Sequence, residues 1–198
     1  MSKHKRIGIF GGTFDPIHNA HMDIARAALK EAHLDRIIFV VSARPPHKHG
    51  GPYASAEDRF AVVSAAVHGN PRFEVSRVEM DREGPSYMVD TLGEMAKLHR
   101  DAALFLIIGL DSFLDLPKWK DPEGIISRAR LLVIRRPNLP DEAPVQLKGR
   151  YDVLKFPETD LSSTEVRDRI VAGGPFDELV PAPVARLIRE RGIYHADH

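Results

Sequence analysis

Two histidines, His18 and His21, stand three residues apart shortly after a pair of glycines. The apolar residues 7–10 predict a buried strand that stops at Gly11 and Gly12, and a helix is expected to begin at His18. A strand, a glycine turn and a helix start can direct backbone N–H groups at phosphate. Residues at i and i+3 share one face of a helical turn, so both imidazoles can reach one anion. The pattern indicates nucleotide chemistry.

The histidine pair has two other interpretations. One is a pair of surface or capping histidines on an ordinary helix, which is the commoner meaning of an isolated H-x-x-H. The other is a metal site, although the nearby carboxylates are Asp15 and Asp23 and no third-ligand motif follows. The glycines do not complete G-x-G-x-x-G, since Phe14 stands where the third glycine belongs, and no G-x-x-x-x-G-K-S/T occurs. Dinucleotide-dependent dehydrogenases and P-loop NTPases are therefore disfavoured.

A second anion site is predicted near the end of the chain. Ser162 and Glu165 form a capping box, which places Ser163 and Thr164 in the first turn of a helix. Their hydroxyls and the free N–H groups would face an anion, helped by the helix dipole. Arg167 lies on the same side and can add charged donors. The alternative is a plain capped helix with a solvated arginine, and in either case we expect Arg167 to be exposed.

Two further segments follow predicted strands. Gly109 ends a buried strand and would let a ligand approach the backbone, while Asp111 can accept hydrogen bonds from ribose hydroxyls. A helix N-cap is an equally good role for Asp111. Trp119, the one tryptophan, follows a proline and lies between two lysines. A lone tryptophan is usually in the core, but this context favours a partly exposed loop position suited to stacking on a flat ring.

Composition limits the class of protein. The 198 residues are 43% hydrophobic and 28% charged, with zero formal net charge, which is ordinary for a soluble globular domain and suggests no nucleic-acid or membrane partner. The absence of cysteine excludes disulfides, thiolate nucleophiles and zinc–thiolate sites. No signal-peptide pattern or long apolar run is found, so we expect a cytoplasmic protein.

Strands and helices are predicted to alternate along the chain. Strands are expected at 6–10, 36–41, 73–75, 103–108, 130–134 and 152–156, and helices at 18–33, 55–68, 86–98, 163–172 and 184–191. Continuous apolar strands between helices predict an α/β fold with a doubly wound parallel sheet covered on both faces. Ligands bind such sheets at the carboxyl ends of the strands. Residues 138–150 are interpreted as a surface loop within one domain.

The glycine–histidine segment resembles a family signature, G-G-T-F-D-P-x-H-x-x-H, of the nucleotidyltransferase superfamily that includes the bacterial nicotinate-nucleotide adenylyltransferases. Residues 161–167 resemble its second motif, I-S-S-T-x-x-R, and L-P-x-W and S-Y-T-x-x-T have counterparts at Trp119 and at residues 86–91. The chain differs at Ala20, Met88 and Leu161, where the family usually has glycine, threonine and isoleucine. The resemblance implies a Rossmann-like single domain over 1–198, with a C-terminal helical part from about residue 160 that carries the second motif.

The resemblance also implies roles for individual residues. The implied catalytic residues are His18, His21 and Arg167. The implied ATP contacts come from Gly11, Gly12, Thr13, Phe14, Gly109, Asp111, Arg135, Ser163 and Thr164. The implied contacts to the mononucleotide come from Lys48, Ser86, Tyr87, Met88 and Trp119. Lys48 and Arg135 lie in basic loops that are otherwise most often solvated.

The implied reaction is transfer of AMP from ATP to nicotinate mononucleotide, giving deamido-NAD and pyrophosphate in NAD biosynthesis. A magnesium ion is expected to arrive with ATP, and a homo-oligomer is left open. The alternatives within the superfamily are an enzyme for nicotinamide mononucleotide, one of dual specificity, or one for phosphopantetheine. Outside it they are a non-catalytic ATP-binding protein and a metal-dependent hydrolase built on the two histidines.

Overall fold

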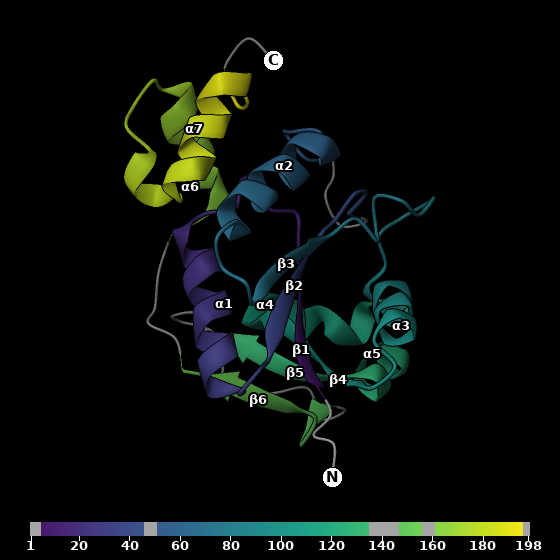
Figure 1. The fold of residues 1–198 in the computed structure, drawn as a ribbon. Helices are drawn as coiled ribbons and strands as arrows, with labels where there is room; N and C mark the ends of the chain where they lie inside the picture. Colours follow the sequence, from purple (N-terminus) through teal and green to yellow (C-terminus); the bar gives the residue numbers. More distant parts are fainter. Residues whose placement is uncertain (1–4, 46–50, 135–146, 156–160, 196–198) are drawn as a thin grey trace.

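A six-stranded parallel sheet forms the centre of the molecule (Figure 1), in a computed structural model that describes residues 5–45, 51–134, 147–155 and 161–195. The strand order is β3-β2-β1-β4-β5-β6. The bounds are β1 (Lys5–Gly12), β2 (Arg36–Val41), β3 (Phe73–Ser76), β4 (Ala102–Gly109), β5 (Ala129–Ile134) and β6 (Tyr151–Leu154). The predicted α/β class and the parallel sheet are confirmed.

Helices cover both faces of the sheet (Figure 1). The α-helices are α1 (Asn19–Glu31), α2 (Ala56–Val67), α3 (Met88–Leu98), α4 (Leu110–Asp115), α5 (Pro122–Arg128), α6 (Ser163–Val171) and α7 (Ala182–Arg191), and the 3₁₀ turns are η1 (Leu116–Lys118) and η3 (Asp177–Leu179). One core contains residues of α1, α2, α6 and α7, and the other contains residues of α3, α4 and α5. The continuous apolar strands are explained by these two cores, because successive side chains of a strand point to opposite faces. In β1, for example, Ile9 joins the α3 side and Phe10 the α1 side.

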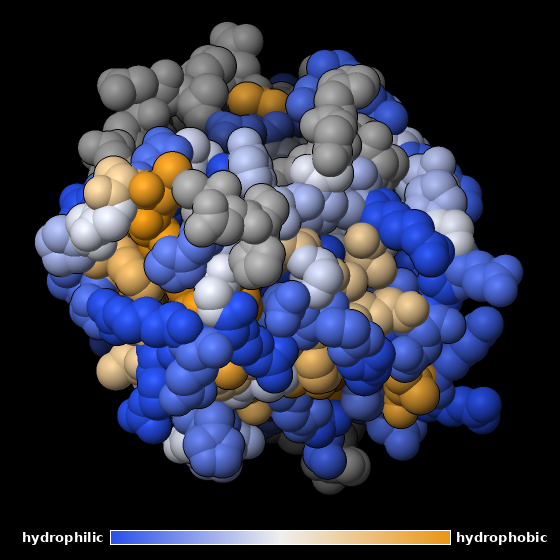
Figure 2. Space-filling view, turned by 90° about the horizontal axis from the view of Figure 1, so that it is seen from above, coloured by the Kyte–Doolittle hydropathy of each residue, from blue (hydrophilic) through white to orange (hydrophobic). Residues whose placement is uncertain are grey.

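The order of the strands places a ligand-binding edge at the end of β1. The chain runs outward from β1 through β2 to β3 and then returns to β4 on the other side of β1. Ligands bind parallel sheets outside the carboxyl ends at such a reversal. In the view onto this end of the molecule, the surface is mostly hydrophilic with small separate hydrophobic patches (Figure 2). No helix in the described parts of the chain is long and apolar enough to cross a membrane.

Four elements and one loop differ from the sequence prediction. The third predicted helix begins at Met88 rather than at Ser86, because Tyr87 is the N-cap. The helices α4 and α5 were not predicted, although Asp121 caps α5 through the Gly124 N–H at 3.0 Å and Pro122 occupies its first position. The strand β6 is shifted toward Tyr151. Leu147, inside the predicted surface loop, is 1% exposed and packs in the α3-side core, so that part of the loop prediction is wrong.

Candidate active site

Two glycines that lie against other residues end β1, so the strand runs through Gly12 and the prediction that it stops before the glycine pair is wrong. A Cβ on Gly11 would lie 2.6 Å from Met88 Cε, and a Cβ on Gly12 would lie 2.9 Å from the Phe14 ring. Both distances are too short for van der Waals contact, so a larger residue would displace the end of the Met88 side chain at Gly11 or the Phe14 ring at Gly12. Phe14 has a φ of 48°, and its ring is 2% exposed and packs edge-on against Phe10. The ring of Phe14 is therefore part of the core, which leaves its backbone for the predicted ATP contact.

His18 and His21 lie together, as predicted from their spacing. Their ring centroids are 3.8 Å apart, and the His18 backbone N–H donates to His21 Nδ1 at 3.3 Å. Because Nδ1 accepts, the proton of a neutral His21 ring is on Nε2, which remains a hydrogen-bond donor. His18 is the N-cap of α1 and is 5% exposed, so the helix begins one residue later than predicted. His18 therefore has the capping role that an isolated H-x-x-H pair usually has. The His21 ring can in addition donate a hydrogen bond to an anion.

The start of α6 is bonded to the β1 turn. The Ser163 hydroxyl donates to Pro16 O at 2.8 Å, and Arg167 donates to Asp15 O at 2.7 Å and to Thr164 Oγ1 at 3.1 Å. Ser162 caps the helix by accepting from the Glu165 N–H at 3.2 Å, as predicted. Arg167 is 9% exposed, and its guanidinium lies 4.2 Å from the centroid of the Tyr53 ring. The expectation of an exposed Arg167 is wrong, because this side chain bonds to buried backbone instead of extending into solvent.

A buried arginine that the sequence analysis did not select fastens the same turn. Arg59 of α2 is 1% exposed and donates to Thr13 O at 2.7 Å, Ser42 O at 2.8 Å and Ala54 O at 3.1 Å. Thr13 and Ser42 directly follow β1 and β2. Burial lowers the pKa of the Arg59 guanidinium below its usual value, and the neighbouring Asp15 charge offsets only part of this effect. The signal in the sequence was its helical spacing from the buried Val62 and Val63, which places a charge on the core face of α2.

Asp15 completes this network, which we call the buried brace: Asp15, Arg59 and Arg167. The Asp15 carboxylate is 1% exposed and accepts from the N–H groups of Tyr53 at 2.8 Å and Ala54 at 3.1 Å. Burial and the Asp15 charge together raise the pKa of Tyr194, which follows α7. Buried polar groups are stable only when they are bonded in this way. The brace therefore connects the turn after β1 to α2, α6 and the end of α7.

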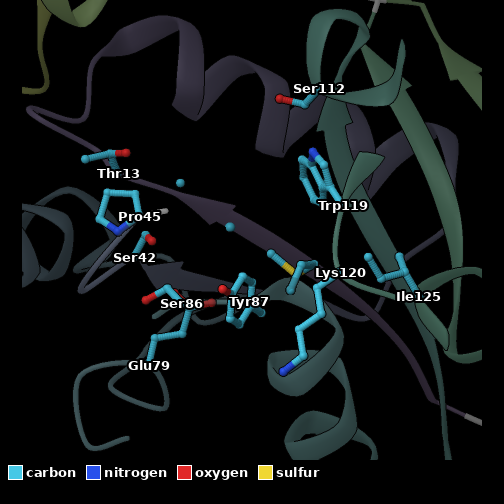
Figure 3. A pocket seen from close by; sticks show the side chains of 13 residues that line it. Thr13, Ser42, Pro45, Glu79, Ser86, Tyr87, Ser112, Trp119, Lys120 and Ile125 are labelled. Atoms are coloured by element: carbon cyan, nitrogen blue, oxygen red, sulfur yellow. The ribbon is translucent and has the colours of Figure 1, made fainter. Parts of the chain in front are cut away.

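A cavity of about 190 Å³ lies beside the glycine turn (Figure 3). Seven predicted site residues line it: Gly11, Gly12, Thr13, Ser86, Tyr87, Met88 and Trp119. Six residues that were not predicted also line it: Ser42, Pro45, Glu79, Ser112, Lys120 and Ile125. Trp119 is half-buried against the α3-side core, in agreement with a partly exposed position beside a ligand. The predicted mononucleotide residues that the structure describes are thus all in the wall of one cavity.

The predicted residues outside this lining set lie in two places. His18, His21, Phe14, Ser163, Thr164 and Arg167 gather around the turn and the start of α6, as described above. Gly109 is the N-cap of α4, and a Cβ there would meet nothing within 4 Å. Asp111 is exposed in the first turn of α4, so its alternative role as the N-cap is wrong. Lys48 and Arg135 lie outside the described residues.

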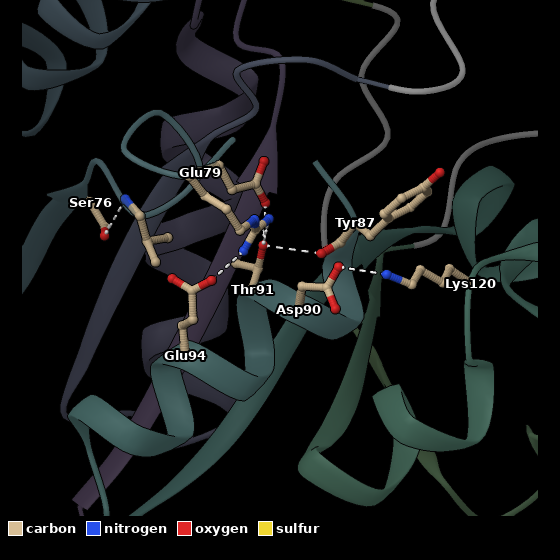
Figure 4. Close-up of polar contacts among 9 residues, drawn as sticks. Ser76, Glu79, Tyr87, Asp90, Thr91, Glu94 and Lys120 are labelled. Carbon is tan, nitrogen blue, oxygen red and sulfur yellow. Dashed lines mark hydrogen bonds and ion pairs between the residues drawn. The ribbon is translucent and has the colours of Figure 1, made fainter. Parts of the chain in front are cut away.

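The α3 wall of the cavity is held by side-chain bonds (Figure 4). Thr91 donates to Glu79 Oε1 at 2.6 Å and accepts from Arg82 at 3.1 Å, while Arg82 also pairs with Glu94 at 2.7 Å. Ser86 does not cap α3. Its hydroxyl accepts from the Arg44 N–H at 3.1 Å and so fastens the loop after β2 to the start of α3. Within the described residues, no group of three or more His, Cys, Asp or Glu side chains is arranged to hold a metal ion.

Comparison with known proteins gives one consistent result. A family model described as cytidylyltransferase-like matches residues 9–169. A probable nicotinate-nucleotide adenylyltransferase of Thermus thermophilus is 44% identical over 96% of this chain and 99% of the relative, and the nicotinate-nucleotide adenylyltransferase of Bacillus subtilis is 38% identical over 97% and 100%. The solved structure of a Plasmodium falciparum nicotinic acid mononucleotide adenylyltransferase complexed with NaAD superposes with a TM-score of 0.79 at 19% identity, covering 96% of this chain and 98% of that one.

Proposed function

Since the chain belongs to the cytidylyltransferase-like family and, within it, to the nicotinate-nucleotide adenylyltransferases, we propose that it joins ATP and nicotinate mononucleotide to give deamido-NAD and pyrophosphate. The observation that carries the proposal is the 44% identity along 96% of the chain to a relative of that name. The cavity supports it, because a glycine turn at one end suits phosphate and Trp119 at the other suits a flat ring.

The chemistry requires positioning more than proton transfer. A phosphate oxygen of the mononucleotide attacks the α-phosphorus of ATP, and the bond from that phosphorus to the bridging oxygen of pyrophosphate breaks. The attacking phosphate is already ionised near neutral pH, so no general base is needed. The protein contributes by aligning the two substrates and by stabilising the charge that develops on the phosphates. Magnesium bound to the ATP phosphates would add charge neutralisation when present.

We assign the phosphates of ATP to the end of the cavity near α1. Gly11 and Gly12 are paired with Val40 and Val41 in the sheet, so the backbone N–H groups that would bind phosphate oxygens are those that follow β1, at Thr13 and Phe14. The positive end of the α1 dipole adds to this field. His21, with its proton on Nε2, would donate to the triphosphate beside His18. Arg167 contributes positive charge while it stays bonded to Asp15 O.

The direct test follows the atoms of ATP. ATP labelled at the α-phosphorus is incubated with nicotinate mononucleotide and magnesium, and the products are separated by chromatography. The label is expected in deamido-NAD, with one equivalent of unlabelled pyrophosphate released. Label that stays in ATP would indicate a protein that binds the nucleotide without turnover, and label in free AMP would indicate a hydrolase.

A further inference from the structure

The described residues that line the cavity include two charged side chains, Glu79 and Lys120, which lie to either side of Tyr87 (Figure 3). Glu79 is 4% exposed and is held by the Thr91 hydroxyl at 2.6 Å. Lys120 is exposed, directly follows Trp119, and has its Nζ 4.6 Å from the centroid of the Tyr87 ring. A ligand in the cavity therefore lies near one carboxylate and one ammonium group.

Lys120 is joined to the opposite wall by one ion pair, which we call the rim pair (Figure 4). Its Nζ donates to Asp90 Oδ2 at 2.9 Å, and the two side chains remain 50% and 39% exposed. A pair this exposed contributes little to folding, so either partner can be changed with little effect on stability. Asp90 lies in the first turn of α3 and Lys120 precedes α5, so the pair connects these two elements next to the cavity residues Tyr87 and Trp119.

An anionic group is favoured on this side of the cavity for two reasons. The Lys120 charge attracts it directly, and the amino end of α3, which begins at Met88 in the cavity wall, carries the positive end of a helix dipole. Asp90 opposes this attraction in part. Glu79, the other carboxylate in this region, is bonded to Thr91, which also accepts from Arg82, so a cation lies beside it.

We propose that Lys120 is a specificity-determining residue that selects a mononucleotide whose ring bears a carboxylate over one whose ring bears a neutral carboxamide. The inference rests on the proposed function and adds to it the side chain that distinguishes the two substrates. A carboxylate and a carboxamide have nearly the same shape, so discrimination between them must come from charge and hydrogen bonding. Lys120 supplies the charge term, Asp90 moderates it, and backbone N–H groups near Tyr87 supply the hydrogen-bonding term.

The experiment measures acid selectivity, which is kcat/KM for nicotinate mononucleotide divided by kcat/KM for nicotinamide mononucleotide. Lys120→Met removes the charge and keeps the length of the side chain. We expect it to lower acid selectivity about threefold to tenfold, since the charge is partly screened by solvent. Lys120→Arg keeps the charge and is expected to keep the selectivity. Asp90→Asn removes the opposing charge and is expected to raise selectivity, so two variants that both break the rim pair move the ratio in opposite directions.

A purely structural rim pair predicts a different result. Lys120→Met and Asp90→Asn would then change kcat/KM for both substrates equally and leave the ratio unchanged, which would overturn the proposal. Equilibrium binding of each mononucleotide without ATP gives the same ratio independently of turnover. If the unmodified protein forms no deamido-NAD, the proposed activity is contradicted. If Lys120→Met nevertheless lowers the acid selectivity of binding, the role of Lys120 is still supported. Unchanged binding selectivity would reject that role whatever the activity.

Discussion

On the β1 side of the cavity the polar groups are buried and bonded to one another, whereas on the α3 side the charges of the rim pair, Lys120 and Asp90, are half exposed. Arg59 makes three hydrogen bonds to backbone carbonyls at 1% exposure, while Lys120 makes one ion pair at 50% side-chain exposure. Buried bonded groups fix a geometry, and exposed pairs change at little cost in stability. From this difference we expect the phosphate end of the site to be rigid, and the ring end to determine which mononucleotide is accepted.

The buried brace is expected to give the largest change in stability. Arg59→Met removes three hydrogen bonds to backbone carbonyls and one of the two cations beside the buried Asp15, which should destabilise the fold by about 3–5 kcal/mol. Thermal unfolding measures the loss. Arg6→Met is the matched control, because Arg6 also donates to a backbone carbonyl, Ala32 O at 3.0 Å, but at the opposite end of β1. Equal effects of the two substitutions would show that the brace has no special place in the fold.

The histidines should affect turnover rather than folding. His18→Ala or His21→Ala is expected to lower kcat about a hundredfold to a thousandfold, because a preorganised donor to developing charge is lost. Steady-state kinetics with saturating mononucleotide gives kcat, and the KM for the mononucleotide should change far less. His68→Ala, at an exposed position after α2, is the control. Near-normal turnover in both variants would contradict a role for the two histidines in binding phosphate and would support a role in capping α1 alone.

Substitution of Arg167 is expected to affect both stability and turnover. The burial of Arg167 changes the expectation drawn from the sequence, in which the side chain was exposed and unimportant for folding. Arg167→Ala should lower the free energy of unfolding by about 1–3 kcal/mol through the lost bond to Asp15 O, and should also raise the KM for ATP or lower kcat. Unfolding and kinetics measured on the same preparation separate the two effects. Unchanged kinetics with a lower melting temperature would make Arg167 a structural residue.

Trp119 gives the smallest expected effect and tests the ring end of the comparison. Trp119→Ala should weaken nicotinate and nicotinamide mononucleotides together, by about 1–2 kcal/mol each, because stacking does not depend on the charge of the ring substituent. Calorimetric titration of both ligands measures it, with Trp119→Phe as the variant that keeps a flat ring. A loss confined to one ligand would mean that Trp119 shares in the selectivity assigned to Lys120.

The sequence predicted the parts of the molecule that depend on local patterns. The apolar strands, the Ser162 cap and the contact between His18 and His21 follow from periodicity and spacing, and all are observed. Arg59 and Lys120 were missed because their roles depend on which elements meet in three dimensions. The sequence does not show that the carbonyl groups of Thr13 and Ser42 lie next to Arg59. It also does not show that Asp90 of α3 lies next to Lys120. The burial of Arg167 was missed for the same reason.

The central claim is tested most directly by a parallel product assay with the unmodified protein. ATP is supplied with nicotinate mononucleotide in one series and with nicotinamide mononucleotide in the other, and dinucleotide and pyrophosphate are both quantified. The account predicts at least about a tenfold higher kcat/KM for the nicotinate substrate, since an amide would put a donor against backbone donors and lose the attraction of Lys120. Equal efficiency on both substrates, or no dinucleotide from either, would contradict it.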